Sequence, residues 1–112
     1  MLIVSIVLFV IAALLGLSVA AALIKKAPTS KPIAVSHGVV GAAALLVLIF
    51  YVAQHPNRLL TWAIGMLVVA ALGGALLFVN DLRQKPGPLG LLVIHALVAV
   101  AAVGLVVLAA FN

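Results

Sequence analysis

Four long apolar stretches, separated by short polar segments, take up nearly the whole chain. They run over about Leu2–Ile24, Ile33–Ala53, Leu59–Val79 and Leu89–Phe111. Each stretch reaches the roughly 20 residues that an α-helix needs to cross the hydrocarbon core of a bilayer. Because the bilayer core holds no water to satisfy free backbone amides, such stretches form helices rather than open strands. The sequence therefore predicts an all-α integral membrane protein with a single transmembrane domain over residues 1–112.

The composition excludes most other classes of protein. Of the 112 residues, 69% are hydrophobic and 6% are charged, whereas a soluble chain of this length needs far more polar surface. Asp81 is the only acidic residue, which leaves almost no groups for general acid–base catalysis. The net charge of +5 is small and dispersed, so it does not predict a nucleic-acid partner, and the absence of cysteine excludes a disulfide scaffold.

The polar segments predict how the chain is oriented in the membrane. Residues 25–32 and 80–88 fall on one side and together carry five Lys and Arg side chains, whereas the turn on the other side carries Arg58 alone. Since basic residues concentrate in cytoplasmic loops, we expect both of these loops in the cytoplasm and both termini in the periplasm of a bacterial inner membrane. Proline and glycine mark the loops as turns, most clearly Pro86-Gly87-Pro88. Asp81 beside Arg83 predicts a solvated ion pair of little energetic weight.

The first apolar stretch does not have the features of a cleavable signal peptide. No basic segment precedes it, its apolar run is too long, and its charges follow the run. We expect it to stay in the protein as the first helix.

The chain also contains a predicted internal repeat. When the sequence is shifted by 58 residues, residues 10–54 align with residues 68–112 without a gap, and Gly, Pro and His matches share this one register. The matches include Gly16 with Gly74, Pro28 with Pro86, and His37 with His95. Each copy holds two spans, so both copies enter the membrane in the same direction, as parallel repeats of a two-helix hairpin. In an up-down four-helix bundle, the second and fourth helices then lie diagonally across from each other.

Two histidines lie within the predicted spans. Ionisable side chains inside a membrane are costly and point to function. His37 and His95 occur near the start of the second and fourth spans, so their depths differ by only a few ångström at about 1.5 Å per residue. Two imidazoles at matched depth on diagonal helices can supply the two axial nitrogens of a haem iron.

This arrangement resembles cytochrome b and the b561-type cytochromes, which carry bis-histidine haem ligands on alternate helices of a transmembrane four-helix bundle. In cytochrome b the ligands lie on the second and fourth helices, as His37 and His95 do here, and glycines on the first and third helices contact the haem edge, as Gly16 and Gly74 could. The resemblance implies haem b on these four residues and a role in electron transfer. The chain departs from those families by having one intramembrane histidine pair instead of two and no polar residues for a quinone or ascorbate site.

Other interpretations of the same residues remain open. Either intramembrane histidine could bond interfacial water, Ser36 or a neighbouring backbone group. The chain would then be a structural or accessory subunit without a cofactor, packing against copies of itself or a larger complex. His55, before Pro56, is typical of a solvated turn residue. Small multidrug-resistance transporters also have four spans, but they depend on an acidic residue in the first helix, and this chain has none there. Zinc would need three or four ligands, and no span has a polar stripe to line a channel.

Overall fold

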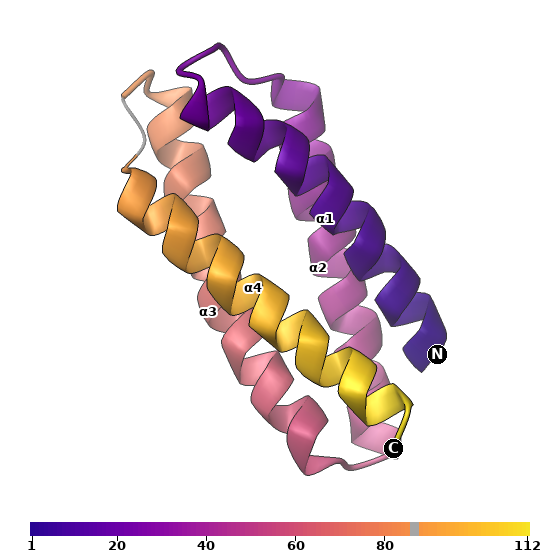
Figure 1. The fold of residues 1–112 in the computed structure, drawn as a ribbon. Coiled ribbons are helices and arrows are strands. Elements are labelled where there is room, and N and C mark those ends of the chain that lie inside the picture. The colour runs from indigo at the N-terminus through magenta and orange to yellow at the C-terminus, as the bar shows by residue number, and fades with distance from the viewer. Residues whose placement is uncertain (86–87) are drawn as a thin grey trace.

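The computed structural model describes residues 1–85 and 88–112 and consists of four helices (Figure 1). The helices are α1 (Leu2–Ile24), α2 (Lys31–Gln54), α3 (Arg58–Leu82) and α4 (Leu89–Ala110). Each is long and apolar enough to span a membrane. The prediction of an all-α chain with four candidate spans is therefore confirmed.

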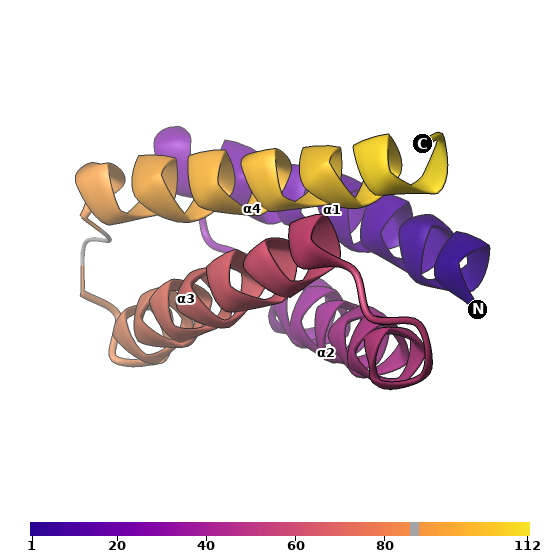
Figure 2. The same ribbon diagram turned by 90° about the horizontal axis from the view of Figure 1, so that it is seen from below.

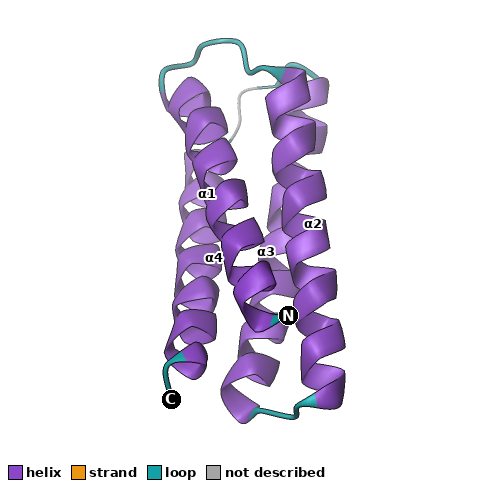
Figure 3. Ribbon diagram, turned by 90° about the vertical axis from the view of Figure 1, so that its right-hand side faces the viewer, coloured by secondary structure: helices purple, strands orange, loops and turns teal. Residues whose placement is uncertain are grey.

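The helices pack as two hairpins. α1 packs along α2 and α3 packs along α4, while smaller interfaces join α2 to α3 and α1 to α4. α2 and α4 therefore face each other across one diagonal of the bundle, as the up-down arrangement requires. The α1–α2 and α3–α4 loops lie at one end, and the α2–α3 turn lies toward the other end with both chain termini (Figures 1 and 3). Seen from below, α1 and α4 lie toward one side of the bundle and α2 and α3 toward the other (Figure 2).

α2 begins at Lys31, two residues before the predicted start at Ile33. Ser30 caps the helix, because its hydroxyl oxygen accepts a hydrogen bond from the backbone N–H of Ile33 at 3.4 Å. Pro32 in the first turn is tolerated there because the first amides of a helix have no carbonyl partner within it. The local sequence thus extends the helix into the polar segment.

α3 continues past the predicted end at Val79 and finishes at Leu82, so Asn80 and Asp81 are helical residues rather than loop residues. Their polar side chains do not end the helix, because at the edge of the apolar span they can reach polar groups. At the other end of the chain, Phe111 follows α4 instead of ending it. The predicted turn over Pro86-Gly87-Pro88 falls partly on residues 86–87, which lie outside the described residues.

α1 and α3 end in the same way. In each, the residue after the helix cap adopts the left-handed conformation: Lys26 has φ 55° and Gln84 has φ 56°. Its N–H and the following N–H bond to carbonyls three and five residues earlier, at 2.9–3.2 Å in both helices. This pattern is a Schellman motif, which satisfies carbonyls that the helix end would leave free. The two left-handed residues lie 58 positions apart.

We expect Gln84→Gly to raise the free energy of unfolding by about 0.5–1 kcal/mol. A side chain in the left-handed region costs about 1–2 kcal/mol, and part of that gain is lost to the greater freedom of glycine in the unfolded chain. Gln84→Ala keeps the strained backbone and should bring no gain. Unfolding in mixed detergent micelles measures both variants, and a glycine variant no more stable than the alanine variant would contradict the assigned turn.

Small side chains and a few large ones fill the core. The largest fully buried side chains are those of Leu48, Leu60, Val106 and Ser5. The Ser5 hydroxyl donates a hydrogen bond to the carbonyl oxygen of Ala44 at 3.0 Å, so this buried polar group is satisfied. Most buried positions recur at a separation of 58 residues: Ser5 with Ala63, Phe9 with Leu67, Ala12 with Ala70, Ala44 with Ala102, and Leu48 with Val106. The two hairpins thus present equivalent positions to the core, while their common origin stays a prediction.

Candidate site at the paired histidines

The two intramembrane histidines meet across the diagonal of the bundle. His37 comes from α2 and His95 from α4, and their ring centroids lie 6.3 Å apart with the ring planes at 83°. Both side chains are half-buried. The structure therefore brings together the two residues that the sequence singled out as candidate ligands.

Each imidazole is held by a backbone carbonyl of the preceding helix. Nδ1 of His37 lies 2.7 Å from the carbonyl oxygen of Ala12, and Nδ1 of His95 lies 2.7 Å from that of Ala70. Because a carbonyl oxygen only accepts, Nδ1 must carry the proton and donate it. A neutral ring then has its lone pair on Nε2, the nitrogen that can bind a metal. Within residues 1–85 and 88–112, no hydrogen-bond partner of either Nε2 atom is found.

The glycines predicted to contact a haem edge lie directly against these imidazoles. A Cβ atom on Gly16 would come within 2.7 Å of Cε1 and 3.0 Å of Nδ1 of His37, and one on Gly74 would come within 2.9 Å of Cε1 of His95. The missing side chains therefore make room for the histidine rings. Each glycine follows the accepting alanine by one helical turn, so one face of α1 or α3 provides both the space and the acceptor. Contact of these glycines with a haem stays a prediction.

A cavity of about 220 Å³ opens beside His95 between α3 and α4. Its other lining residues are Val69, Ala70, Gly73, Leu91, Ile94 and Val98. Gly73 also lines this space, and a Cβ atom there would make only ordinary contacts, the nearest being the Cβ of His95 at 3.8 Å. The cavity reaches one of the two histidines and does not include His37.

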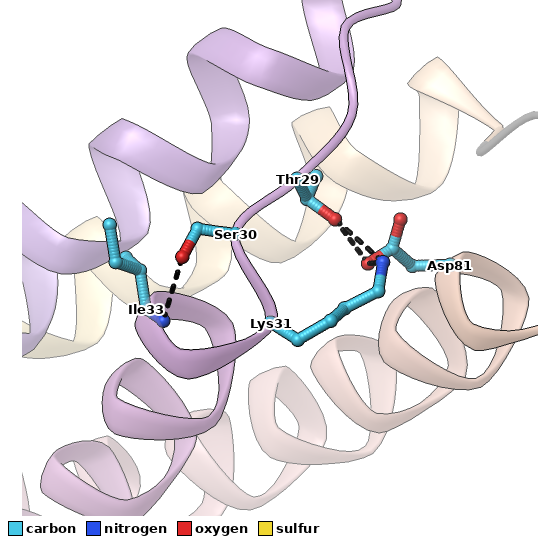
Figure 4. A network of polar contacts seen from close by, with 5 residues as sticks. All are labelled: Thr29, Ser30, Lys31, Ile33 and Asp81. Atoms are coloured by element: carbon cyan, nitrogen blue, oxygen red, sulfur yellow. Dashed lines mark hydrogen bonds and ion pairs between the residues drawn. The ribbon is translucent and has the colours of Figure 1, made fainter.

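Asp81 does not pair with Arg83, so that prediction was wrong. Its carboxylate accepts hydrogen bonds from the ammonium group of Lys31, at 2.6 Å, and from the hydroxyl of Thr29 (Figure 4). The Lys31 ammonium group also donates to the Thr29 hydroxyl oxygen at 2.9 Å. The three additional helical residues of α3 carry Asp81 to the start of α2, whereas Arg83 lies beyond the helix end and is exposed. This cluster joins the two hairpins at their loop end.

The third histidine lies away from this pair. His55 is exposed in the α2–α3 turn and stacks on Tyr51, with centroids 4.6 Å apart and planes at 17°. Its place agrees with a solvated turn residue. Among the described residues, no group of three or more His, Cys, Asp or Glu side chains is placed to hold a metal ion.

Sequence reasoning found both histidines and both glycines but missed the carbonyl acceptors. Every residue has a backbone carbonyl, so the residue type does not reveal which carbonyl accepts a hydrogen bond. The only available signal was an alanine one helical turn before each glycine, at Ala12 and Ala70. The Lys31–Asp81 contact, between residues far apart in the chain, was also missed.

Comparisons with known proteins assign the chain to no family. It matches no protein-family model, no curated protein and no solved structure at a significant level. What can be said of its function therefore comes from its own residues: the chain has four helices able to span a membrane, with two histidines meeting between them.

Proposed function

We propose that this chain is a four-span inner-membrane protein that binds one haem b between α2 and α4 and transfers electrons. His37 and His95 are the proposed axial ligands. The observation that carries the proposal is their juxtaposition, with both Nδ1 atoms bonded to carbonyls and both Nε2 atoms left as potential ligands.

The donor set fits a haem iron. His37 and His95 would hold the iron through Nε2, the ring nitrogen of each that has no hydrogen-bond partner among the described residues. Histidine ligands commonly donate their other ring N–H to a carbonyl, which fixes the ring and makes the ligating nitrogen more basic. The carbonyls of Ala12 and Ala70 provide this support.

A macrocycle between the rings needs more space than the 220 Å³ cavity beside His95 supplies. In this proposal the hairpins separate to admit it, since the interfaces between hairpins are smaller than those within them. Each histidine can keep its carbonyl partner during that movement, because the bond from His37 to Ala12 lies within one hairpin and that from His95 to Ala70 within the other.

The protein residues have a limited role in this activity. The carbonyls orient the imidazoles, and Gly16 and Gly74 allow the rings to approach α1 and α3 closely. The surrounding apolar side chains keep water from the rings. The haem, when bound, supplies the chemistry, which is the uptake and release of one electron at its iron.

The distribution of charge supports a membrane location and an orientation. Four exposed helical faces rich in apolar side chains suit contact with lipid. The loop end carries five of the six Lys and Arg residues, which favours that end in the cytoplasm.

The test is a visible spectrum of the protein purified in detergent from haem-replete cells, oxidised and then reduced with dithionite. We expect a sharp reduced α band that is lost in both His37→Ala and His95→Ala. His55→Ala, which removes the exposed turn histidine, should keep the band. A colourless wild-type protein would refute the proposal.

The second candidate is an accessory membrane subunit without a cofactor. The close packing of both imidazoles against glycine favours it, because satisfied polar side chains also stabilise contacts between helices in lipid. In that case the protein is colourless, and both alanine variants lower stability without changing any spectrum.

A further inference from the structure

Nearly all the positive charge of the chain gathers at one end of the bundle. Of the six Lys and Arg residues, Arg58 alone lies at the α2–α3 turn. The other five lie around the α1–α2 and α3–α4 loops, and all are exposed: Lys25, Lys26, Lys31, Arg83 and Lys85.

This charge has almost no internal counterion. The chain contains one acidic side chain, Asp81, and Lys31 occupies it at 2.6 Å together with Thr29. The C-terminal carboxylate lies toward the opposite end of the bundle (Figure 1). Four cations at the loop end therefore have no carboxylate side chain left in the chain to pair with.

The backbone holds these cations in two equivalent turns. Lys25 and Arg83 occupy the cap positions of α1 and α3, and the Schellman motifs fix the backbone directly after them. Exposed apolar side chains adjoin them: Ile24 is 62% exposed and Leu82 is 54% exposed. A cation next to an exposed apolar side chain matches a phospholipid, which presents a phosphate above an acyl chain.

We propose that the loop end, defined by Lys25, Lys26, Arg83 and Lys85, binds the headgroups of anionic phospholipids. The proposal rests on the membrane location proposed above and is independent of haem. Near an anionic bilayer surface each Lys or Arg adds attraction that corresponds to roughly a fivefold change in affinity. Asp81 limits this attraction by neutralising Lys31.

The test uses the full chain in nanodiscs of phosphatidylcholine, with or without about one third phosphatidylglycerol. After gentle extraction, native mass spectrometry counts the phosphatidylglycerol molecules retained on the protein. We expect enrichment of phosphatidylglycerol over its share of the disc, decreasing at high salt. Lys25→Gln with Arg83→Gln should lower the retained phosphatidylglycerol-to-phosphatidylcholine ratio, relative to that of the disc, by an order of magnitude or more, at roughly fivefold in affinity per cation.

Arg58→Gln is the control at the opposite end of the bundle, where it removes a single cation and should lower the enrichment by about fivefold at most, well short of the loss in the double variant. Asp81→Asn frees Lys31 and should increase the enrichment, a gain that misfolding does not produce. Equal enrichment in wild type and the Lys25/Arg83 double variant, or a loss in Arg58→Gln as large as in the double variant, would overturn the proposal. Alkaline extraction of native membranes tests the membrane location separately. An integral membrane protein stays in the membrane fraction, whereas a wrong membrane location would release the wild type and all variants alike.

Discussion

Gly16→Ala and Gly74→Ala are each expected to destabilise the bundle by about 1–3 kcal/mol, the usual range for an overpacked core. The new methyl group would lie 2.7 Å from His37 in the first case and 2.9 Å from His95 in the second. Relief requires the imidazole to move, and movement strains the 2.7 Å hydrogen bond from Nδ1 to the carbonyl of Ala12 or Ala70. Steric conflict and a weakened hydrogen bond therefore act in the same direction.

Neighbouring glycines provide the controls for these substitutions. At Gly73 a Cβ atom has ordinary contacts of 3.8 Å or more, and at Gly38 and Gly104 it meets nothing within 4 Å. Alanine at these positions should be neutral or stabilising by up to about 1 kcal/mol, because glycine is a poor helix former. Equilibrium unfolding in mixed micelles compares the variants. If Gly74→Ala were as stable as Gly73→Ala, the close packing of His95 on α3 would be wrong.

Leu48→Ala is expected to lower the free energy of unfolding by about 1–3 kcal/mol, from lost packing and the cavity left behind. Leu48 is fully buried, with 0% exposure, in the centre of the core. The expected loss lies below the upper range for soluble proteins, because the unfolded side chain enters lipid instead of water and little hydrophobic transfer energy is at stake.

Leu46→Ala makes the same chemical change two residues earlier on α2, where the side chain is 66% exposed. Since Leu46 faces lipid, its truncation should change stability by less than about 0.5 kcal/mol. The same unfolding assay measures both variants. A loss at Leu46 that equals or exceeds the loss at Leu48 would mean that α2 presents a different face to the core.

The spans could be predicted from the sequence because the bilayer fixes both their length and their apolar character. The ends were less predictable. α3 runs through Asn80 and Asp81 because polar residues at the edge of a span can stay helical when a partner is near, and that partner, Lys31, comes from another hairpin. Hydropathy alone carries no information about such a contact.

The candidate site was likewise predictable in part. His37 and His95 stood out because an ionisable group in a membrane has a cost that the sequence reveals. Their hydrogen-bond partners could not be predicted from the sequence, because the acceptors are the backbone carbonyls of Ala12 and Ala70. The position of the rings against Gly16 and Gly74 depended on the packing angle of each hairpin.

The Lys31–Asp81 contact also determines in which direction the bundle can open. It ties the start of α2 to the end of α3, and the covalent turn between Gln54 and Arg58 ties the same two helices at the other end. The interface between α2 and α3 is thus held together at both of its ends. In the described residues no side-chain hydrogen bond or ion pair joins α1 to α4, the first and last helices. Separation of the hairpins would therefore be a hinge motion about the α2–α3 interface. A flat molecule would enter laterally from the lipid, between α1 and α4.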